Sequence, residues 1–410
     1  MRILVITLLY APDGGPSATL YQTLCEGLAR RGHAVTMIAA VPHYPSGRVP
    51  PDFRGRWITR TVENSVTVIR VRLPSLNRAR FSRRLIQFFV YQIGAAVAGW
   101  RGRYDAAILG NPALEIYLPA LVHVGLRRIP ALYSIHDVYP DVGVALGIFR
   151  NRLVRGMVGA LEKHLYHLSK GIRLTSESFA PPLLRAGIPQ VKMSLIYDWV
   201  DTEALQPRPR QNDFSAEHGL NDSFVALYAG NIGLSQRLET ILAAAVLLPA
   251  VQFVFVGEGT GRDSLQRAAA GLPNVRILPF QPRERLPEVL ATADVHLISL
   301  KAGLESGSLP SKTYSAFASG RPLLAIMAAG AAWGVIERAG AGVRCDPDDA
   351  PCLAAQLEAL RADPLRRADM GRAGRAAAEK YHSAAAAVVA FEAALQRIIL
   401  SRLRRGEGDL

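Results

Sequence analysis

Short apolar runs alternate with helix-period patterns along most of this 410-residue chain. The apolar run at residues 2–10 predicts a buried strand, residues 17–31 predict a helix that ends at Gly32, and residues 34–41 predict the next strand. A further buried strand is expected at residues 130–138. Strands that alternate with helices in this way predict a parallel, doubly wound sheet.

A segment at residues 206–222 interrupts the pattern with two prolines and charges of both signs, which predicts a linker. The alternation then restarts, and 410 residues exceed what one core usually supports. We therefore expect an α/β protein with two Rossmann-like, doubly wound domains and a cleft between them. The expected domains are residues 1–205 and 206–385, and a C-terminal helix and basic tail at 386–410 is expected to pack back on the first domain.

The segment at residues 299–326 indicates where an anion could bind. It combines a strand, a Gly/Ser-rich loop, a helix start and a second strand, with Ser308, Pro310, Ser311 and Lys312 at the expected helix start. A helix start has unpaired N–H groups and a partial positive charge, so it favours anions. The dipole disfavours a cation in the first turn, so Lys312 is easiest to explain if an anion such as a diphosphate neutralises it.

Three glycine-rich loops follow expected strands. They are Asp13-Gly14-Gly15-Pro16, the loop from Ala229 through Gly230 and Asn231 to Gly233, and Gly257-Glu258-Gly259-Thr260-Gly261. Glycine allows tight turns and close approach of a ligand, and a plain turn remains the alternative for each loop. None has the G-x-G-x-x-G pattern, which disfavours a dinucleotide-binding dehydrogenase. Arg237, near the next helix start, is either a solvated side chain or a forked phosphate donor.

His136 and Asp137 end an expected strand of the first domain. A histidine at this end of a strand is a candidate for the cleft, and a hydrogen-bonded structural histidine is the alternative.

The net charge is +14, from 48 Lys and Arg against 34 Asp and Glu, which indicates an anionic partner. No nucleic-acid-binding signature is present, so we expect no nucleic acid. The sharpest basic cluster is Arg78, Arg80, Arg83 and Arg84, followed by the apolar residues 85–100. Sixteen residues are too few to span a bilayer, which takes about 20. The pattern fits either a helix on an anionic membrane surface or a core helix with a solvated basic end.

The three cysteines, Cys25, Cys345 and Cys352, have no metal-ligand spacing. We interpret them as ordinary buried thiols, which suits a reducing, cytoplasmic compartment. The short apolar run after Met1 lacks a cleavage pattern, so no signal peptide is expected.

Taken in order, several segments resemble one family. They are LYAPDGGPSATLYQTLCEGLARRGHAVTMIA, IHDVYPD, IYDWVDTEAL, LYAGNIGLSQRLETIL, VFVGEGTGRDSL and LPSKTYSAFASGRPLLAI. Over nearly the whole chain the sequence resembles retaining, family-four glycosyltransferases of the GT-B fold, of the colanic-acid and O-antigen type. The resemblance implies transfer of a sugar from a nucleotide-sugar substrate, without a metal ion or other cofactor. It also implies that the second domain binds the donor and the first binds the acceptor.

The resemblance assigns roles by position. His136 and Asp137 are expected near the reacting sugar, and Lys312 and Arg237 at the leaving diphosphate. The remaining residues expected around the donor are Gly14, Gly15, Asn231, Gly257, Glu258, Gly259, Pro279, Phe280, Glu305, Gly307, Ser308, Leu309, Pro310, Ser311 and Ser315.

The sequence departs from the family pattern in three places. The positions of the family's two glutamates are Gly307 and Ser315 here, with Glu305 two residues early. The Arg and Lys that commonly follow the second domain's first strand are Asn231 and Gln236, and the common Asn before Trp-Val-Asp is Asp198. The missing glutamates leave an inactive nucleotide-sugar-binding subunit as an alternative, and a nucleotide-sugar epimerase of the same fold is a second one, because a fold does not fix a function.

By the same resemblance the donor is expected to be UDP-linked. The acceptor is expected to be a polyprenyl-diphosphate-linked sugar at the inner face of the cell membrane.

Overall fold

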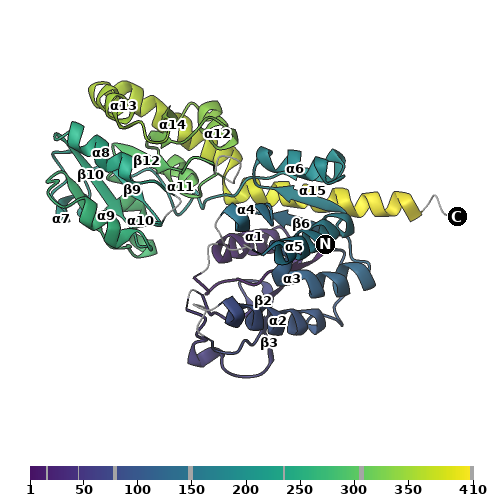
Figure 1. The fold of residues 1–410 in the computed structure, drawn as a ribbon. Helices are drawn as coiled ribbons and strands as arrows, with labels where there is room; N and C mark the ends of the chain where they lie inside the picture. Colours follow the sequence, from purple (N-terminus) through teal and green to yellow (C-terminus); the bar gives the residue numbers. More distant parts are fainter. Residues whose placement is uncertain are drawn as a thin grey trace. The chain divides into compact units, whose positions relative to one another are not determined.

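The computed structural model describes residues 1–14, 17–44, 46–76, 81–145, 151–233, 236–303 and 309–406. The chain divides into two compact units, which are drawn in Figure 1. Unit 1 comprises Met1–Tyr197 and Ala387–Leu410, and unit 2 comprises Asp198–Ala386. The division falls a few residues before the position 205/206 expected from the sequence.

The sheet of unit 1 has the order β3-β4-β2-β1-β5-β6-β7-β8, and the described pairs are parallel except β3 with β4. Its strands are β1 (Arg2–Ile6), β2 (Ala34–Ala40), β3 (Ile58–Glu63), β4 (Val66–Val71), β5 (Ala106–Gly110), β6 (Ala131–Ile135), β7 (Gly171–Leu174) and β8 (Met193–Leu195). β1, β5 and β6 are almost wholly buried, as expected for central strands with helices on both faces.

The edge strand β3 was not predicted. Its sequence, ITRTVE, is mostly polar and largely exposed, so it has no buried-strand signal. Asn64 and Ser65 both have positive φ, at 47° and 66°, which suits a two-residue hairpin turn between β3 and β4.

The helices of unit 1 include α2, which packs on α3, and α15, which packs on α1. The helices are α1 (Ala18–Arg30), α2 (Phe81–Val97), α3 (Ala113–Ala120), α4 (Asp141–Ala145), α5 (Arg152–Leu168), α6 (Ala180–Arg185) and α15 (Ala384–Gly406), with a π-helical turn at Leu121–Leu126 and short 3₁₀ turns at Pro51–Phe53, Glu177–Phe179 and Gln190–Lys192. Gly27 of α1 allows the close approach of α15, since a Cβ there would lie 2.4 Å from a methyl carbon of Val388.

Unit 2 has the sheet order β11-β10-β9-β12-β13-β14 with parallel pairs, the order of a dinucleotide-type Rossmann sheet. Its strands are β9 (Phe224–Ala229), β10 (Val251–Val256), β11 (Val275–Leu278), β12 (Val295–Ser299), β13 (Leu323–Ile326) and β14 (Gly342–Cys345). Strand order reverses between β9 and β12, so the crevice for a ligand is expected at their carboxyl ends. The prediction of two doubly wound α/β domains is confirmed.

The helices of unit 2 cover both faces of its sheet (Figure 1), with α13 packed on α8, and α14 packed on α11 and α12. They are α7 (Asp213–Glu217), α8 (Glu239–Leu247), α9 (Arg262–Ala268), α10 (Leu286–Ala291), α11 (Lys312–Ala318), α12 (Ala331–Ala339), α13 (Ala350–Ala362) and α14 (Pro364–Tyr381), with a 3₁₀ turn at Arg283–Arg285.

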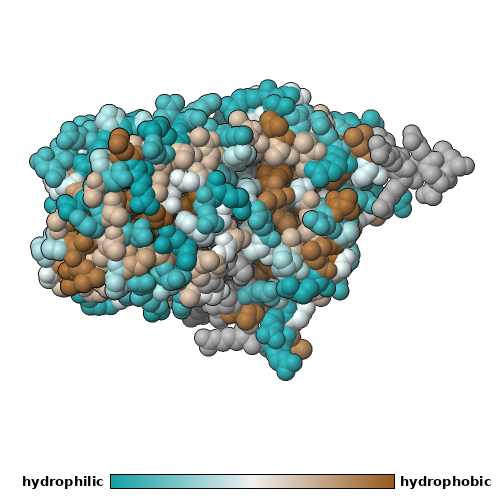
Figure 2. All heavy atoms as spheres, turned by 90° about the horizontal axis from the view of Figure 1, so that it is seen from above, coloured by the Kyte–Doolittle hydropathy of each residue, from teal (hydrophilic) through white to brown (hydrophobic). Residues whose placement is uncertain are grey.

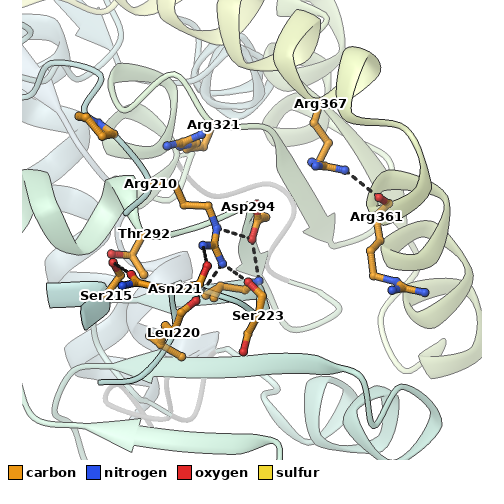
Figure 3. A network of polar contacts seen from close by, with 12 residues as sticks. Arg210, Ser215, Leu220, Asn221, Ser223, Thr292, Asp294, Arg321, Arg361 and Arg367 are labelled. Atoms are coloured by element: carbon orange, nitrogen blue, oxygen red, sulfur yellow. Dashed lines mark hydrogen bonds and ion pairs between the residues drawn. The ribbon is translucent and has the colours of Figure 1, made fainter. Parts of the chain in front are cut away.

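The segment expected to be a linker is bound into unit 2 (Figure 3). Arg210 donates to Asp294 at 2.8 Å and to the carbonyls of Asn221 at 2.8 Å and Leu220 at 3.1 Å. Asp294 also accepts from the backbone N–H of Val225, the second residue of β9, at 2.8 Å. One guanidinium therefore ties this segment to the amino end of the sheet.

The structure corrects the expectation for two cysteines. Cys345 and Cys352 form a disulfide, whereas Cys25 is a buried thiol as expected. Cys345 ends β14 and Cys352 lies in the first turn of α13, and the short connection brings their Cα atoms to 5.9 Å, within the range for a disulfide. Sequence separation alone did not indicate this proximity.

Within the described residues, one stretch is long and apolar enough to cross a membrane: Ala384–Ser401 of α15, with a mean hydropathy of 1.6. Val388, Phe391 and Leu395 of this helix are buried. A helix that packs on a protein core meets the same criteria, so the stretch is weak evidence for a membrane span. The face seen in Figure 2 carries hydrophilic side chains between separate apolar patches.

Candidate functional site

The helix α11 begins where the sequence predicted a helix start. Ser311 is its N-cap residue and makes no side-chain capping hydrogen bond, and Lys312 is the first helical residue. Leu309 is buried, while Ser311 is exposed. Of the other residues predicted in this loop, Glu305, Gly307 and Ser308 lie outside the described residues. With only seven residues α11 has a weak dipole, so the side chain of Lys312 is the more informative feature.

Lys312 is a half-buried cation that faces an aromatic ring. Its Nζ lies 3.9 Å from the ring centroid of Tyr228, on β9, and donates to the Tyr228 hydroxyl. That hydroxyl in turn donates to the carbonyl of Asn231 at 2.7 Å. Among the described residues no carboxylate forms an ion pair with Lys312. Burial without an anionic partner lowers the pKa of Lys312 to about 7.

Glycine residues bring the loops after β9 and β10 into direct contact. A Cβ at Gly257 would lie 1.9 Å from the carbonyl oxygen of Gly230, and a Cβ at Gly259 would lie 2.3 Å from that of Ile232. Backbone hydrogen bonds from Gly230 to Val256 at 2.9 Å and from Ile232 to Glu258 at 2.8 Å join the two loops. Two reasons therefore require glycine at positions 257 and 259. A Cβ would clash with the neighbouring loop, and the φ angles of 159° and 154° are rarely adopted by other residues.

The same loops lie next to Lys312, since a Cβ at Gly230 would be 3.5 Å from its Cε. The structure therefore brings together three features predicted from separate parts of the sequence: Lys312, the Gly230-Asn231 turn, and the loop that contains Gly257 and Gly259. They gather at the carboxyl ends of β9 and β10, where a doubly wound sheet binds its ligand.

Glu258, Pro279 and Phe280 lie at the outer part of this site. Gly257 donates to the carbonyl of Leu278 at 3.1 Å, which places the glycine loop beside the turn that follows β11. Phe280 in that turn is 69% exposed, an unusual position for a phenylalanine and one suited to stacking on a flat ring. Glu258 approaches Arg262 at 3.6 Å.

Arg237 makes a contact that the sequence did not indicate. Its Nε lies 2.8 Å from Asp348, in the connection between β14 and α13, and both side chains are about half exposed. Arg237 and Lys301 also line a cavity of about 470 Å³ beside α8 and α9. The described contacts do not bring Arg237 to Lys312 directly, but Ile232, Gly233 and Gly261 of the two glycine loops line the same cavity as Arg237. Ser315, on the second turn of α11, is half-buried.

In unit 1, His136 follows β6 and lies near a buried arginine. Arg173 of β7 is fully buried, donates to the carbonyl of Ile196 at 2.7 Å and to Ser134 at 3.1 Å, and places Nη1 3.4 Å from Nε2 of His136. The hydroxyl of Tyr21 lies 3.5 Å from the same nitrogen. Because a guanidinium only donates, Nε2 of His136 accepts, and the proton of the neutral ring is assigned to Nδ1.

Glu162 is a polar group of unit 1 that the sequence reasoning missed. Its buried carboxyl accepts from the hydroxyl of Tyr133 at 2.7 Å, the N–H of Ala113 at 2.8 Å and Asn111 at 3.4 Å. Asn111 accepts from the N–H of Asp137 at 3.3 Å, so the network reaches the predicted pair. Burial raises the pKa of Glu162 to about 7. The sequence offered one signal for the burial of Glu162: it lies four residues after Val158, which is buried on the same helix, α5.

The first glycine loop is positioned by Asp13. Its carboxylate accepts from the N–H groups of His43 and Tyr44, both at 3.1 Å. Gly14 is exposed beside this anchor. Gly15, predicted to contact the donor phosphate, lies outside the described residues.

The helix predicted to contact a membrane, α2, has two unlike sides. Tyr91 and Ala95 are buried in the core. The opposite side exposes Leu85, Ile86, Phe89, Ile93 and Val97, and Trp100 follows. The buried side is that of a core helix, whereas contact of the exposed apolar side with a membrane surface stays a prediction. Arg83 and Arg84 lie in its first turn, and Arg78 and Arg80 lie outside the described residues.

Comparison with known proteins finds glycosyl transferases for both parts of the chain. Residues 14–199 match the model of a "Glycosyl transferase 4-like domain", and residues 210–377 match "Glycosyl transferases group 1". The chain is 26% identical over 333 residues to the putative colanic acid biosynthesis glycosyl transferase WcaI of Escherichia coli K12, covering 78% of this chain and 82% of the relative. It is 24% identical over 374 residues to the probable glycosyltransferase WbjE of Pseudomonas aeruginosa, covering 88% and 89%.

Solved structures share the fold at lower identity. Sucrose-phosphate synthase from Thermosynechococcus elongatus aligns with a TM-score of 0.74 at 18% identity, covering 98% of this chain and all of that chain. HepE from Anabaena, solved in complex with UDP, aligns with a TM-score of 0.71 at 16% identity, covering 97% and 100%.

Proposed function

Because the chain belongs to the group 1 glycosyl transferases and has the GT-B fold, we propose that it transfers a hexosyl or N-acetylhexosaminyl group from a UDP-linked donor to a lipid-linked or polysaccharide-precursor acceptor. The reaction proceeds with retention and without a metal ion. The observation that carries this proposal is Lys312, a half-buried cation with no ion-pair partner among the described residues, beside glycine loops at the carboxyl edge of the second sheet.

Lys312 binds the diphosphate of the donor. When the bond between the sugar carbon and the diphosphate oxygen breaks, the electron pair leaves with the nucleotide, and negative charge grows on the diphosphate. A preorganised ammonium stabilises that charge more strongly than it stabilises the bound donor, which is what lowers the barrier. Unlike a fully solvated lysine, Lys312 is half-buried and held by Tyr228.

The other residues of unit 2 bind the nucleotide. Gly257 holds the loop against the Gly230 turn, exposed Gly259 leaves its backbone open to close approach, and Phe280 stacks on the base. HepE, which shares the fold, was solved with UDP, which supports a UDP-linked donor.

In unit 1, His136 carries its proton on Nδ1 and donates a hydrogen bond to a hydroxyl of the reacting sugar. Asp137 lies near the same sugar. Arg173 holds the ring in this tautomer. The acceptor hydroxyl attacks the sugar carbon on the same face from which the diphosphate leaves, so the anomeric configuration is retained. The proton of the acceptor hydroxyl passes to the departing phosphate oxygen.

The acceptor is a polyprenyl-diphosphate-linked sugar at the inner face of the cell membrane. The exposed apolar side of α2, with Arg83 and Arg84 in its first turn, supports contact with an anionic membrane surface. The relative WcaI, a putative colanic acid biosynthesis enzyme, supports a role in polysaccharide synthesis.

Screening UDP-, GDP- and dTDP-sugars by thermal shift identifies the donor, because a bound ligand stabilises the fold by mass action. Transfer to a polyprenyl-diphosphate-linked acceptor is then measured with and without EDTA, and the anomeric configuration of the product is determined. Lys312→Ala is expected to lower turnover by about 2–4 kcal/mol of transition-state stabilisation. Near-normal turnover in this variant contradicts the diphosphate role, and epimerised donor without acceptor contradicts transfer.

A further inference from the structure

Unit 1 contains a cavity of about 1000 Å³ that the proposed reaction does not use. Its lining includes Ala34 at the start of β2, Thr67 near the start of β4, and the loop at residues 98–104 that leads to β5. These are the amino ends of parallel strands, whereas His136 follows the carboxyl end of β6. The cavity therefore lies at the edge of the sheet opposite to the proposed site.

The lining of this cavity combines apolar side chains with arginine. Ile58, Ile69, Val97 and Val122 supply apolar surface, and Arg60, Arg101 and Arg103 supply charge. None of these three arginines forms an ion pair with a carboxylate of the described residues, whereas Arg2, which also lines the cavity, pairs with Asp105 at 2.6 Å. No aspartate or glutamate lines the cavity. The charge therefore suits an anionic ligand with an apolar part.

The cavity is continuous with the exposed apolar side of α2. Ile86, Phe89, Ile93, Val97 and Trp100 follow one another at spacings of three or four residues, so they form one stripe along the helix and just beyond it. Val97 is 59% exposed and Trp100 48% exposed, and both also line the cavity. Apolar side chains therefore lead from the exposed side of α2 to the mouth of the cavity.

We propose that this cavity binds one acyl chain of an anionic phospholipid, whose phosphate lies against Arg60, Arg101 and Arg103. A stripe of exposed apolar side chains leading to the cavity favours a lipid over a soluble nucleotide, which would leave that stripe uncovered in water. Arginine matches a phosphate with its forked N–H groups and attracts an anionic leaflet. The site would hold unit 1 on the membrane that carries the acceptor, and it shares no residue with the proposed donor site.

The test uses the full-length protein and three soluble probes: dihexanoyl phosphatidylglycerol below its micelle concentration, dihexanoyl phosphatidylcholine, and inorganic phosphate. Calorimetric titration is expected to show binding of phosphatidylglycerol at least about ten-fold tighter than either other probe. Arg101→Glu with Arg103→Glu is expected to weaken that binding at least about ten-fold. The control, Arg267→Glu with Arg366→Glu, makes the same change in net charge on exposed positions of α9 and α14 and should bind as the wild type does.

Filling the cavity tests the acyl chain. Thr67→Phe is expected to abolish phosphatidylglycerol binding. If Thr67→Phe fails to fold, Val97→Asn, at an exposed position, removes apolar lining without adding charge and is expected to weaken that binding. Equal binding of inorganic phosphate overturns the lipid part of the proposal, equal binding of phosphatidylcholine overturns the charge part, and absence of binding overturns both. UDP affinity, measured on the same variants, should be unchanged, so loss of the donor site is recognised separately.

Discussion

The carboxyl edges of the two sheets carry polar groups of different kinds. In unit 1 they are side chains that other side chains already satisfy: Glu162 accepts from Tyr133 and Ala113, and Arg173 donates to Ser134 and Ile196. In unit 2 the edge consists mainly of glycine backbone, with one half-buried cation, Lys312, that contacts a hydroxyl and a ring instead of an anion.

This difference separates two tasks. Buried polar groups that satisfy one another fix a shape, and removing one leaves its partners unsatisfied. A cation held without an anion, at an edge built of glycine backbone, leaves its charge available for a ligand. We therefore expect deletion of a side chain from the unit 1 network to act on stability first, and deletion of the Lys312 side chain to act on ligand binding first.

Gly257→Ala is expected to have the largest effect on stability. The new Cβ would lie 1.9 Å from the carbonyl of Gly230, and φ of 159° is strained for alanine. Overpacking and backbone strain each cost about 1–3 kcal/mol, so unit 2 should lose about 3 kcal/mol or more of unfolding free energy. Urea unfolding measures the loss, and Gly271→Ala, with positive φ but open space, is the control that isolates strain. Similar losses in both variants would show that the contact between the loops is unimportant.

Glu162→Gln is expected to remove a pH dependence. The pKa of Glu162 is raised by burial to about 7, above its unfolded value of 4.5, so the folded state retains a proton that the unfolded state loses. Stability of the wild type should therefore fall as pH rises from about 5 to about 7, by at most about 1.4 kcal/mol per pH unit from this group. The glutamine variant, which resembles the neutral acid, should match the wild type near pH 5 and exceed it above pH 7.

Urea unfolding at several pH values measures this dependence. Glu358→Gln, at an exposed ion pair with Arg361, provides the control and should follow the wild type. A glutamine variant that keeps the wild-type slope between pH 5 and pH 7 would place the titrating group elsewhere.

Asp348→Asn is expected to have the smallest effect on stability. An exposed ion pair contributes less than about 1 kcal/mol, so the melting temperature should hardly change. If Arg237 contributes to donor binding, its release from Asp348 should tighten UDP binding several-fold, and Arg237→Ala should weaken it. Unchanged UDP affinity in both variants would restrict the diphosphate site to Lys312 and the glycine loops.

The sequence predicted the features that repeat or that glycine requires: the alternation of strands and helices, the helix start at Lys312, and the loops at Gly230 and Gly257. It did not predict features that depend on which segments meet. Glu162 is polar on a helix whose buried side it shares with Leu165, Arg237 turns to Asp348 more than a hundred residues away, and the disulfide joins two cysteines that appeared to be separate thiols. Each depends on tertiary contact, for which periodicity carries no signal.

The central claim is that Lys312 binds the diphosphate of the donor. Its pKa, lowered by burial to about 7, should rise when an anion binds, so binding of UDP at pH 8 should take up nearly one proton. Calorimetric titration of UDP in buffers of different ionisation enthalpy measures this uptake directly. The account predicts uptake by the wild type, and its loss in Lys312→Met together with weaker binding. Equal UDP affinity and equal proton uptake in the two proteins would contradict it.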